Sequence, residues 1–140
     1  MVAWANRLST ILVVDDDASS RLVLRSVLEP SGYEVIEAPD GQAALDIIGS
    51  LILPDIVVTD LEMPVLGGAA LISRLRGDSL TKAIPIVVVS GELEAALALH
   101  GSGHVDAVVG KPVDSGALAV LIDSLARKSW MADRSGMGAD

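Results

Sequence analysis

The sequence has no cysteine and no phenylalanine, and its 140 residues include only three aromatic ones, Trp4, Tyr33 and Trp130. Without cysteine there can be no disulfide bond and no thiol chemistry. Hydrophobic residues still make up 51% of the chain, so the core must be aliphatic. No apolar run is long enough to cross a bilayer, and Ile11–Val14 is cut off by three aspartates. We therefore expect no signal peptide, no membrane insertion and a cytoplasmic location.

Basic residues are scarce as well. The 10 lysines and arginines are outnumbered by 19 aspartates and glutamates, which gives a formal net charge of −9. Direct binding of nucleic acid needs a basic face, so this composition argues against it. The length suits one domain with a substantial core.

Short β-branched segments recur along the chain and predict five strands. Four of the five are continuously apolar rather than alternating, which indicates strands buried on both faces of a parallel sheet. The predicted strands are Ile11–Val14, Glu34–Ala38, Ile56–Thr59, Ile86–Ser90 and Ala107–Val109.

The segments after these strands have the apolar spacing of helices. Pro30 and Gly32 end the first helix, Asp40 caps the second, Gly77 closes the third, and Asp114 or Ser115 caps the fifth. The apolar positions are Val23, Leu24, Val27 and Leu28; Ala44, Leu45, Ile47 and Ile48; Leu71, Ile72 and Leu75; Leu93–Leu99; and Leu118, Leu121, Ile122 and Leu125.

A strand followed by a helix, five times, predicts a doubly wound α/β fold with right-handed crossovers and strand order 2-1-3-4-5. We expect the domain to cover residues 10–128, with an N-terminal extension at 1–9 and a C-terminal tail at 129–140. Arg127–Asp140 is polar, contains glycine and is too short for another domain, so it is expected to be a helix end followed by a frayed tail.

Polar residues gather where four of these strands end. Asp15 and Asp16 follow the first strand, Asp60 the third and Lys111 the fifth, while Ser90 ends the fourth. The carboxyl ends of parallel strands share one edge of the sheet, which is where ligands bind in such folds. We therefore expect these five side chains to meet.

Their chemistry suits phosphoryl transfer. Two carboxylates about 4 Å apart repel by roughly 4 kcal/mol at an effective dielectric near 20. Such a cluster protonates or recruits a hard cation, and oxygen ligands favour Mg²⁺. With the metal and Lys111 shielding the phosphate, a carboxylate can act as nucleophile, and Ser90 can donate a hydrogen bond to a phosphoryl oxygen.

Several motifs together resemble the receiver domain of two-component response regulators. They are Leu12-Val13-Val14-Asp15-Asp16, Gly32-Tyr33-Glu34-Val35, Asp40-Gly41, Asp60-Leu61-Glu62-Met63-Pro64, Ser90 and Lys111-Pro112. The resemblance runs from about Thr10 to Lys128 and implies a flavodoxin-like three-layer sandwich. Each motif is weak alone, but their order and their places at strand ends make the set strong.

The resemblance implies a role for each site residue. Asp60 is the phosphoacceptor, and Ser90 and Lys111 hold phosphoryl oxygens. Asp16, Asp60 and the backbone carbonyl of Glu62 bind Mg²⁺, while Asp15 acts mainly through water. The Lys111–Pro112 peptide bond is expected to be cis.

The resemblance also implies a signalling role. The donor would be a histidine kinase or a histidine phosphotransfer protein, docking on Ala18–Val23 beside Pro112 and Val113, with Leu22 as an exposed apolar group. The domain would be a monomer and no enzyme beyond its own phosphorylation and autodephosphorylation. It would serve as a stand-alone regulator, a phosphorelay receiver or the receiver of a hybrid kinase.

Two other functions also use aspartates or phosphate loops at strand ends. A haloacid-dehalogenase-like phosphatase would use Asp15 as nucleophile with Asp17 as the second carboxylate, but its late acidic pair and its substrate-covering cap are missing. A flavodoxin-type module would need a Ser/Thr/Gly-rich phosphate loop after the first strand, and none is present.

Other residues have simpler expectations. Asp17 is expected to cap a helix, and Gly67 and Gly68 to serve a loop that needs positive φ. His100 and His104 lack a third metal ligand nearby. In similar receivers Tyr or Phe usually stands three positions before the site lysine, but this chain has Val108. We therefore expect a muted change on the surface of the fourth helix, fifth strand and fifth helix.

Overall fold

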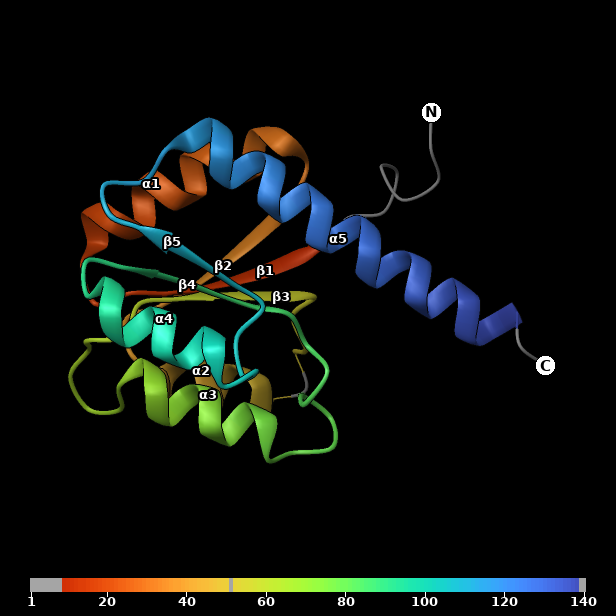
Figure 1. The fold of residues 1–140 in the computed structure, drawn as a ribbon, viewed down its shortest axis with the longest axis horizontal. Helices are drawn as coiled ribbons and strands as arrows, with labels where there is room; N and C mark the ends of the chain where they lie inside the picture. The colour runs from red at the N-terminus through yellow and green to blue at the C-terminus, as the bar shows by residue number, and fades with distance from the viewer. Residues whose placement is uncertain (1–8, 51, 139–140) are drawn as a thin grey trace.

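A computed structural model describes residues 9–50 and 52–138, and within them the chain forms one parallel sheet of five strands. The strands are β1 (Thr10–Val14), β2 (Glu34–Ala38), β3 (Ile56–Thr59), β4 (Ile86–Ser90) and β5 (Ala107–Gly110). Their order is β2-β1-β3-β4-β5 (Figure 1). The predicted topology is therefore confirmed, and each predicted strand agrees with the observed one to within one residue at either end.

Helices cover both faces of the sheet and make a three-layer sandwich (Figure 1). The helices are α1 (Ala18–Leu28), α2 (Gly41–Gly49), α3 (Gly68–Arg76), α4 (Leu93–Gly101) and α5 (Ser115–Gly138). Helices α1 and α5 lie on one face, while α2, α3 and α4 lie on the other.

The core is aliphatic, and successive strand residues pack on opposite faces, as the pleat of a strand requires. In β1, Ile11 and Val13 pack with Leu28 of α1 and Ile122 of α5. Their neighbours Leu12 and Val14 pack on the opposite face, in the cluster that α2, α3 and α4 complete. The strands are continuously apolar because both faces of the sheet are covered by helices.

Helix α1 differs from its expected pattern in one position. Leu24 and Leu28 are buried and Val27 packs beside them, but Val23 is 47% exposed. Placing Val23 in the buried stripe was therefore wrong. The helix ends as predicted near Pro30, in a 3₁₀ turn at Glu29–Ser31, and Gly32 follows with φ of 97°.

Helix α5 differs more. It continues to Gly138, so residues 129–138, expected to be a frayed tail, are helical. No proline follows Pro112, and after Gly116 in the first turn only Gly136 and Gly138 interrupt a run of residues compatible with a helix. Figure 1 shows the helix projecting past the edge of the sheet. Across the described residues, no helix combines the length and apolar character needed to cross a bilayer.

Arg76, in the last turn of α3, holds together the loops at the amino ends of β4 and β5. Its Nε donates to the carbonyl of His104 at 2.9 Å, and its Nη1 donates to the carbonyls of Lys82 and Ile84 at 2.9 and 2.7 Å. Its Nη2 binds Asp106 at 3.1 Å, and the same carboxylate oxygen accepts the Ile86 N–H at 2.8 Å. Replacing Arg76 would leave these acceptors without their donor.

We predict that Arg76→Met lowers the free energy of unfolding by about 2 kcal/mol, because several hydrogen bonds are lost at once. Arg74→Met is the matched control on the same helix, where an exposed side chain should cost less than about 0.5 kcal/mol. Arg76→Lys should recover only part of the loss, since an ammonium cannot reproduce the planar fork. Urea unfolding measures all three, and equal losses at positions 74 and 76 would contradict the assignment.

Candidate phosphoryl-transfer site

The five predicted site residues lie at the carboxyl edge of the sheet, where the side chains of Asp15, Asp16, Asp60 and Lys111 come together. Asp15 and Asp16 follow β1, Asp60 follows β3, Ser90 ends β4 and Lys111 follows β5. One carboxylate oxygen from each of Asp15, Asp16 and Asp60 lies within 4.8 Å of the others. The sheet order produces this meeting, because β1 and β3 are adjacent and β4 and β5 lie beside them.

Asp60 has both carboxylate oxygens engaged. Oδ1 accepts the backbone N–H of Leu61 at 2.7 Å, and Oδ2 accepts the Lys111 ammonium at 2.9 Å. The side chain is 14% exposed. Asp60 is therefore oriented by two donors while a lone pair remains open to an incoming group.

Lys111 bridges two carboxylates. Its Nζ lies 2.9 Å from Asp60 Oδ2 and 3.0 Å from Asp15 Oδ2. Burial alone would lower the pKa of Lys111, but its hydrogen bonds to Asp60 and Asp15 outweigh this and raise the pKa above its ordinary value. The Lys111–Pro112 peptide bond is cis, as expected, and the Lys111 N–H donates to the carbonyl of Ser90 at 3.1 Å.

Asp15 is 1% exposed, and each of its polar groups has a partner. Oδ1 accepts the Asp17 N–H at 2.9 Å, Oδ2 binds Lys111, and the backbone N–H donates to the carbonyl of Ala38 at 3.1 Å. A carboxylate this enclosed is poorly placed to attack a substrate. The geometry therefore disfavours the phosphatase alternative with Asp15 as nucleophile.

Arg21 completes the surroundings of Asp15, and no sequence motif identified it as part of the site. Its Nη1 donates to the Asp15 carbonyl at 2.7 Å, and its Nε binds Glu37 on β2 at 2.9 Å. Burial of Glu37 would raise its pKa, but hydrogen bonds from Arg25 and Arg21 outweigh this and lower it. These ion pairs tie α1 to β2 behind the acidic cluster.

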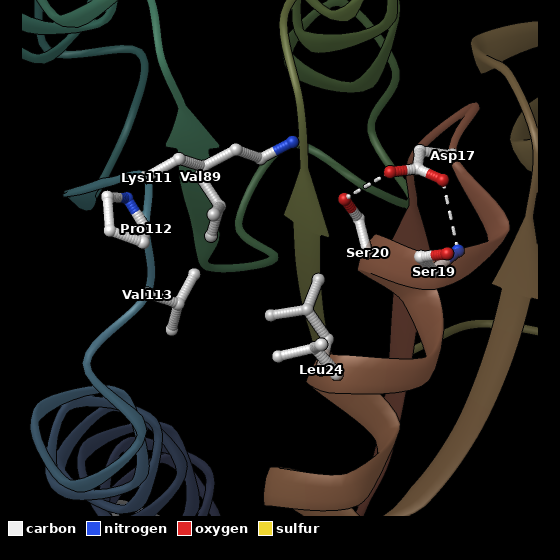
Figure 2. A pocket seen from close by; sticks show the side chains of 9 residues that line it. Asp17, Ser19, Ser20, Leu24, Val89, Lys111, Pro112 and Val113 are labelled. Carbon is white, nitrogen blue, oxygen red and sulfur yellow. Dashed lines mark hydrogen bonds between the residues drawn. The ribbon is translucent and has the colours of Figure 1, made fainter.

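Asp17 lies outside the cluster of Asp15, Asp16 and Asp60 and caps α1, as expected. Its Oδ1 accepts the Ser19 N–H at 3.0 Å, and its Oδ2 accepts the Ser20 hydroxyl at 3.1 Å (Figure 2). Asp16, between Asp15 and Asp17, is exposed. Of the three consecutive aspartates, one is therefore buried, one faces solvent beside the other site carboxylates and one caps a helix.

Ser90 is 1% exposed at the end of β4. Its Oγ accepts the Glu92 N–H at 2.9 Å, which leaves the hydroxyl hydrogen able to donate. Glu62 lies two residues after Asp60 and is exposed. Its backbone carbonyl as a metal ligand remains a prediction.

The expectation that Gly67 and Gly68 provide positive φ in the loop after Asp60 was wrong. The positive φ of this loop lies at Val65, with φ of 68°, whereas Gly67 has φ of −75°. Gly68 is needed for close packing instead, because a Cβ there would lie 2.1 Å from the Asp60 carbonyl oxygen. The sequence pattern identifies both glycines, but it does not reveal the close contact with Asp60 that requires Gly68.

A cleft of about 300 Å³ opens beside Lys111, between the start of α1 and the loop that leads into α5. Figure 2 shows Ser19, Ser20 and Leu24 on one side and Pro112 and Val113 on the other. The lining is mainly apolar, and Val23, found exposed above, is part of it. An apolar side chain could therefore be received next to the site.

The donors and acceptors at this edge define what the site can do. Oxygen ligands in a cluster of net negative charge suit a hard cation such as Mg²⁺, which keeps several waters and takes few carboxylates. The Asp60 carboxylate, the Ser90 hydroxyl and the Lys111 ammonium lie at the same edge of the sheet. They are a nucleophile and two hydrogen-bond donors of the kind that phosphoryl transfer needs.

Comparison with known proteins gives the same picture. The family described as response regulator receiver domain matches residues 11–123. The phosphate regulon transcriptional regulatory protein PhoB of Pseudomonas aeruginosa is 32% identical over 125 residues, which are 89% of this chain and 54% of that protein. The sensor histidine kinase TmoS of Ectopseudomonas mendocina is 37% identical over 87 residues, which are 62% of this chain and 9% of that protein.

Among solved structures, the chemotaxis response regulator CheY4 of Vibrio cholerae superposes with a TM-score of 0.76 at 27% identity, covering 85% of this chain and 99% of that one. The chain thus spans about half the length of PhoB and a small part of TmoS. The family match, the sheet order and the residues at its carboxyl edge agree, and the chain belongs to the response regulator receiver domain family of two-component signalling.

Proposed function

We propose that this receiver domain accepts a phosphoryl group on Asp60 from a phosphohistidine donor, with Mg²⁺ as cofactor. The observation that carries the proposal is the placement of Asp60. Its carboxylate is held by the Leu61 N–H and by Lys111, and it lies within 4.8 Å of carboxylate oxygens of Asp15 and Asp16.

In the transfer, an Asp60 oxygen forms a bond to phosphorus as the bond from phosphorus to the donor imidazole nitrogen breaks. The imidazole leaves with the electron pair of that bond and is neutral once it holds one proton. Ser90 and Lys111 bind phosphoryl oxygens, and the positive charge of Lys111 offsets the charge that collects there. No other covalent step is needed from the protein.

Mg²⁺ bound by Asp16, Asp60 and the Glu62 carbonyl, with Asp15 acting through water, would supply further positive charge at the phosphoryl oxygens. The buried and fully engaged carboxylate of Asp15 supports its indirect role. The exposed carboxylate of Asp16 supports a direct one.

The partner is a histidine kinase or a histidine phosphotransfer protein. The domain occupies residues 10–128, acts as a monomer and does not bind nucleic acid directly. It is a signalling module whose chemistry is limited to its own phosphorylation and the hydrolysis of its own acyl phosphate. It serves as a stand-alone regulator, a phosphorelay receiver or the receiver of a hybrid kinase.

Phosphorylation should depend on Asp60. With acetyl phosphate and Mg²⁺, the wild-type chain is expected to gain one phosphoryl group, measured by intact mass, and the label should be stable in acid and labile in base. Asp60→Asn should gain none, because an amide is not a competent nucleophile here. Asp78→Asn, at an exposed carboxylate after α3, is the control and should be labelled like wild type. Labelling of Asp60→Asn at the wild-type level would refute the assignment.

Magnesium should stabilise the fold, because it binds the native carboxylate cluster and not the unfolded chain. The gain follows RT ln(1 + [L]/Kd), about 2.7 kcal/mol at a metal concentration 100 times Kd. The melting temperature should rise in millimolar Mg²⁺, and Asp16→Asn should remove most of the rise.

Asp17→Asn is the matched control for this measurement. It removes the next carboxylate along the chain but keeps a side chain that can cap α1. If Asp16→Asn responds to Mg²⁺ as strongly as Asp17→Asn does, Asp16 is not a ligand.

The donor should dock over the cleft beside Lys111, on the first turns of α1 and on Pro112 and Val113. The cleft is apolar, and Leu22 on α1 is 64% exposed, so a partner would bury both. Leu22→Asp and Val113→Asp should each slow transfer from the phosphohistidine donor at least about tenfold, since desolvating a charge there is costly. Both variants should still be labelled by acetyl phosphate.

Leu53→Asp provides the control for this surface. Leu53 is 43% exposed in the loop before β3, at the opposite end of the sheet. Transfer to Leu53→Asp should match wild type. Undiminished transfer to both Leu22→Asp and Val113→Asp would rule out the docking surface.

A further inference from the structure

We infer that Thr59 is a positioning residue, whose hydroxyl fixes the Asp60 carboxylate through the Asp60–Leu61 peptide. The inference rests on the proposed role of Asp60 as phosphoacceptor. Thr59 is the last residue of β3 and is 1% exposed, so its hydroxyl must find a partner within the protein. The hydroxyl donates to the carbonyl oxygen of Asp60 at 2.8 Å.

The Asp60 carbonyl lies just past the end of β3, where the sheet no longer sets the orientation of the peptide. Close packing of Gly68 also restricts the orientation of this peptide. A Cβ at Gly68 would lie 2.1 Å from the Asp60 oxygen and 2.8 Å from the Leu61 Cα, so the first turn of α3 rests directly on this peptide. The Gly68 N–H also donates to the Leu61 carbonyl at 2.8 Å.

The same peptide carries the N–H that holds the nucleophile. The Asp60 carbonyl and the Leu61 N–H belong to one planar unit, so they can rotate only together. That N–H lies 2.7 Å from Asp60 Oδ1. Fixing the carbonyl with Thr59 and Gly68 therefore fixes the direction of the N–H, and with it one of the two donors that orient the carboxylate.

Lys111 alone cannot fix the orientation of the Asp60 carboxylate. Its ammonium holds Oδ2 but is shared with Asp15, and an ammonium on a flexible stem sets a distance better than an orientation. The reacting oxygen must stay in line with the bond that breaks, and small misplacements are costly in such reactions. The Leu61 N–H supplies the second point that defines the carboxylate plane, and Thr59 supports it.

A purely structural role for Thr59 makes different predictions. If the hydroxyl only satisfies a buried carbonyl, its loss lowers stability, but the folded protein reacts at the normal rate. If it positions Asp60, the rate at saturating Mg²⁺ and phosphodonor falls in protein that is still folded. The two roles therefore separate when the maximal labelling rate is measured under conditions where circular dichroism shows the variant to be native.

The test compares Thr59→Val, which keeps the shape but removes the donor, with Thr59→Ser, which keeps the donor. With acetyl phosphate as probe, the maximal labelling rate of Thr59→Val should fall about tenfold, whereas Thr59→Ser should stay within about twofold of wild type. The Leu61 amide proton should shift upfield in Thr59→Val but not in Thr59→Ser, because its bond to Oδ1 lengthens. If Thr59→Val does not fold, Thr59→Ala replaces it in the same two measurements.

A folded Thr59→Val with the wild-type rate and an unmoved Leu61 amide would overturn the inference, as would a Thr59→Ser as slow as Thr59→Val. Failure of the proposed function looks different. In that case wild type itself takes no label at Asp60, and the rate comparison has no reference. The Leu61 amide shift needs no phosphorylation, and it still tests whether Thr59, through the Asp60 carbonyl, orients the Leu61 N–H toward the carboxylate.

Discussion

The ammonium of Lys111, shared between Asp15 and Asp60, is the interaction on which the site depends. The parallel sheet places β1 and β3 side by side, so the residues that follow them carry their carboxylates to the same small volume. At an effective dielectric near 20, one pair of such charges at about 4 Å costs roughly 4 kcal/mol. Lys111 reaches both carboxylates from β5, at 3.0 and 2.9 Å, and offsets part of this repulsion. What remains is an excess of negative charge that favours a cation.

Hydrogen bonds from neighbouring residues hold the carboxylates of Asp15 and Asp60 in place without cancelling their net negative charge. Asp15 is held through both carboxylate oxygens and through its backbone carbonyl, which Arg21 binds. Arg21 is held in turn by Glu37, so α1, β1 and β2 are joined behind the site. Asp60 is held by one peptide N–H and one ammonium. The buried carboxylate of Asp15 thus belongs to the scaffold, while that of Asp60, the proposed phosphoacceptor, keeps its capacity to bind an incoming group.

The sequence was sufficient to predict the fold and the places of the candidate site residues at the strand ends, because both depend on strong local signals. Continuous apolar strands such as β3 and β4 appear only in sheets covered on both faces, and strand ends carry the chemistry in such folds. The contacts around the site could not be predicted in the same way. Whether Gly68 serves a turn or close packing depends on how near α3 approaches the Asp60 carbonyl, and no local pattern encodes that distance. The same holds for Thr59 and Arg21, whose partners are set by tertiary structure. The prediction of a frayed C-terminal tail was wrong because it relied on local composition alone. The polar residues and glycines of this segment did not prevent α5 from continuing to Gly138.

The position of Val108 limits how a change at the site can travel. Val108 lies in β5, three residues before Lys111, and is half-buried against the cluster beneath α2, α3 and α4. The resemblance to receivers implies an aromatic ring at this position, and this chain has none there. Valine has one strongly preferred rotamer and no hydroxyl to exchange between partners. Ser90, one strand away, can move toward a phosphoryl group only by giving up or bending its bond to the Glu92 N–H, at the start of α4. If Asp60 is phosphorylated as proposed, we expect the response to pass through the backbone that leads into α4, or to be read directly beside Asp60, where the apolar cleft lies. The second route suits a receiver whose partner contacts the carboxyl edge of the sheet beside Asp60.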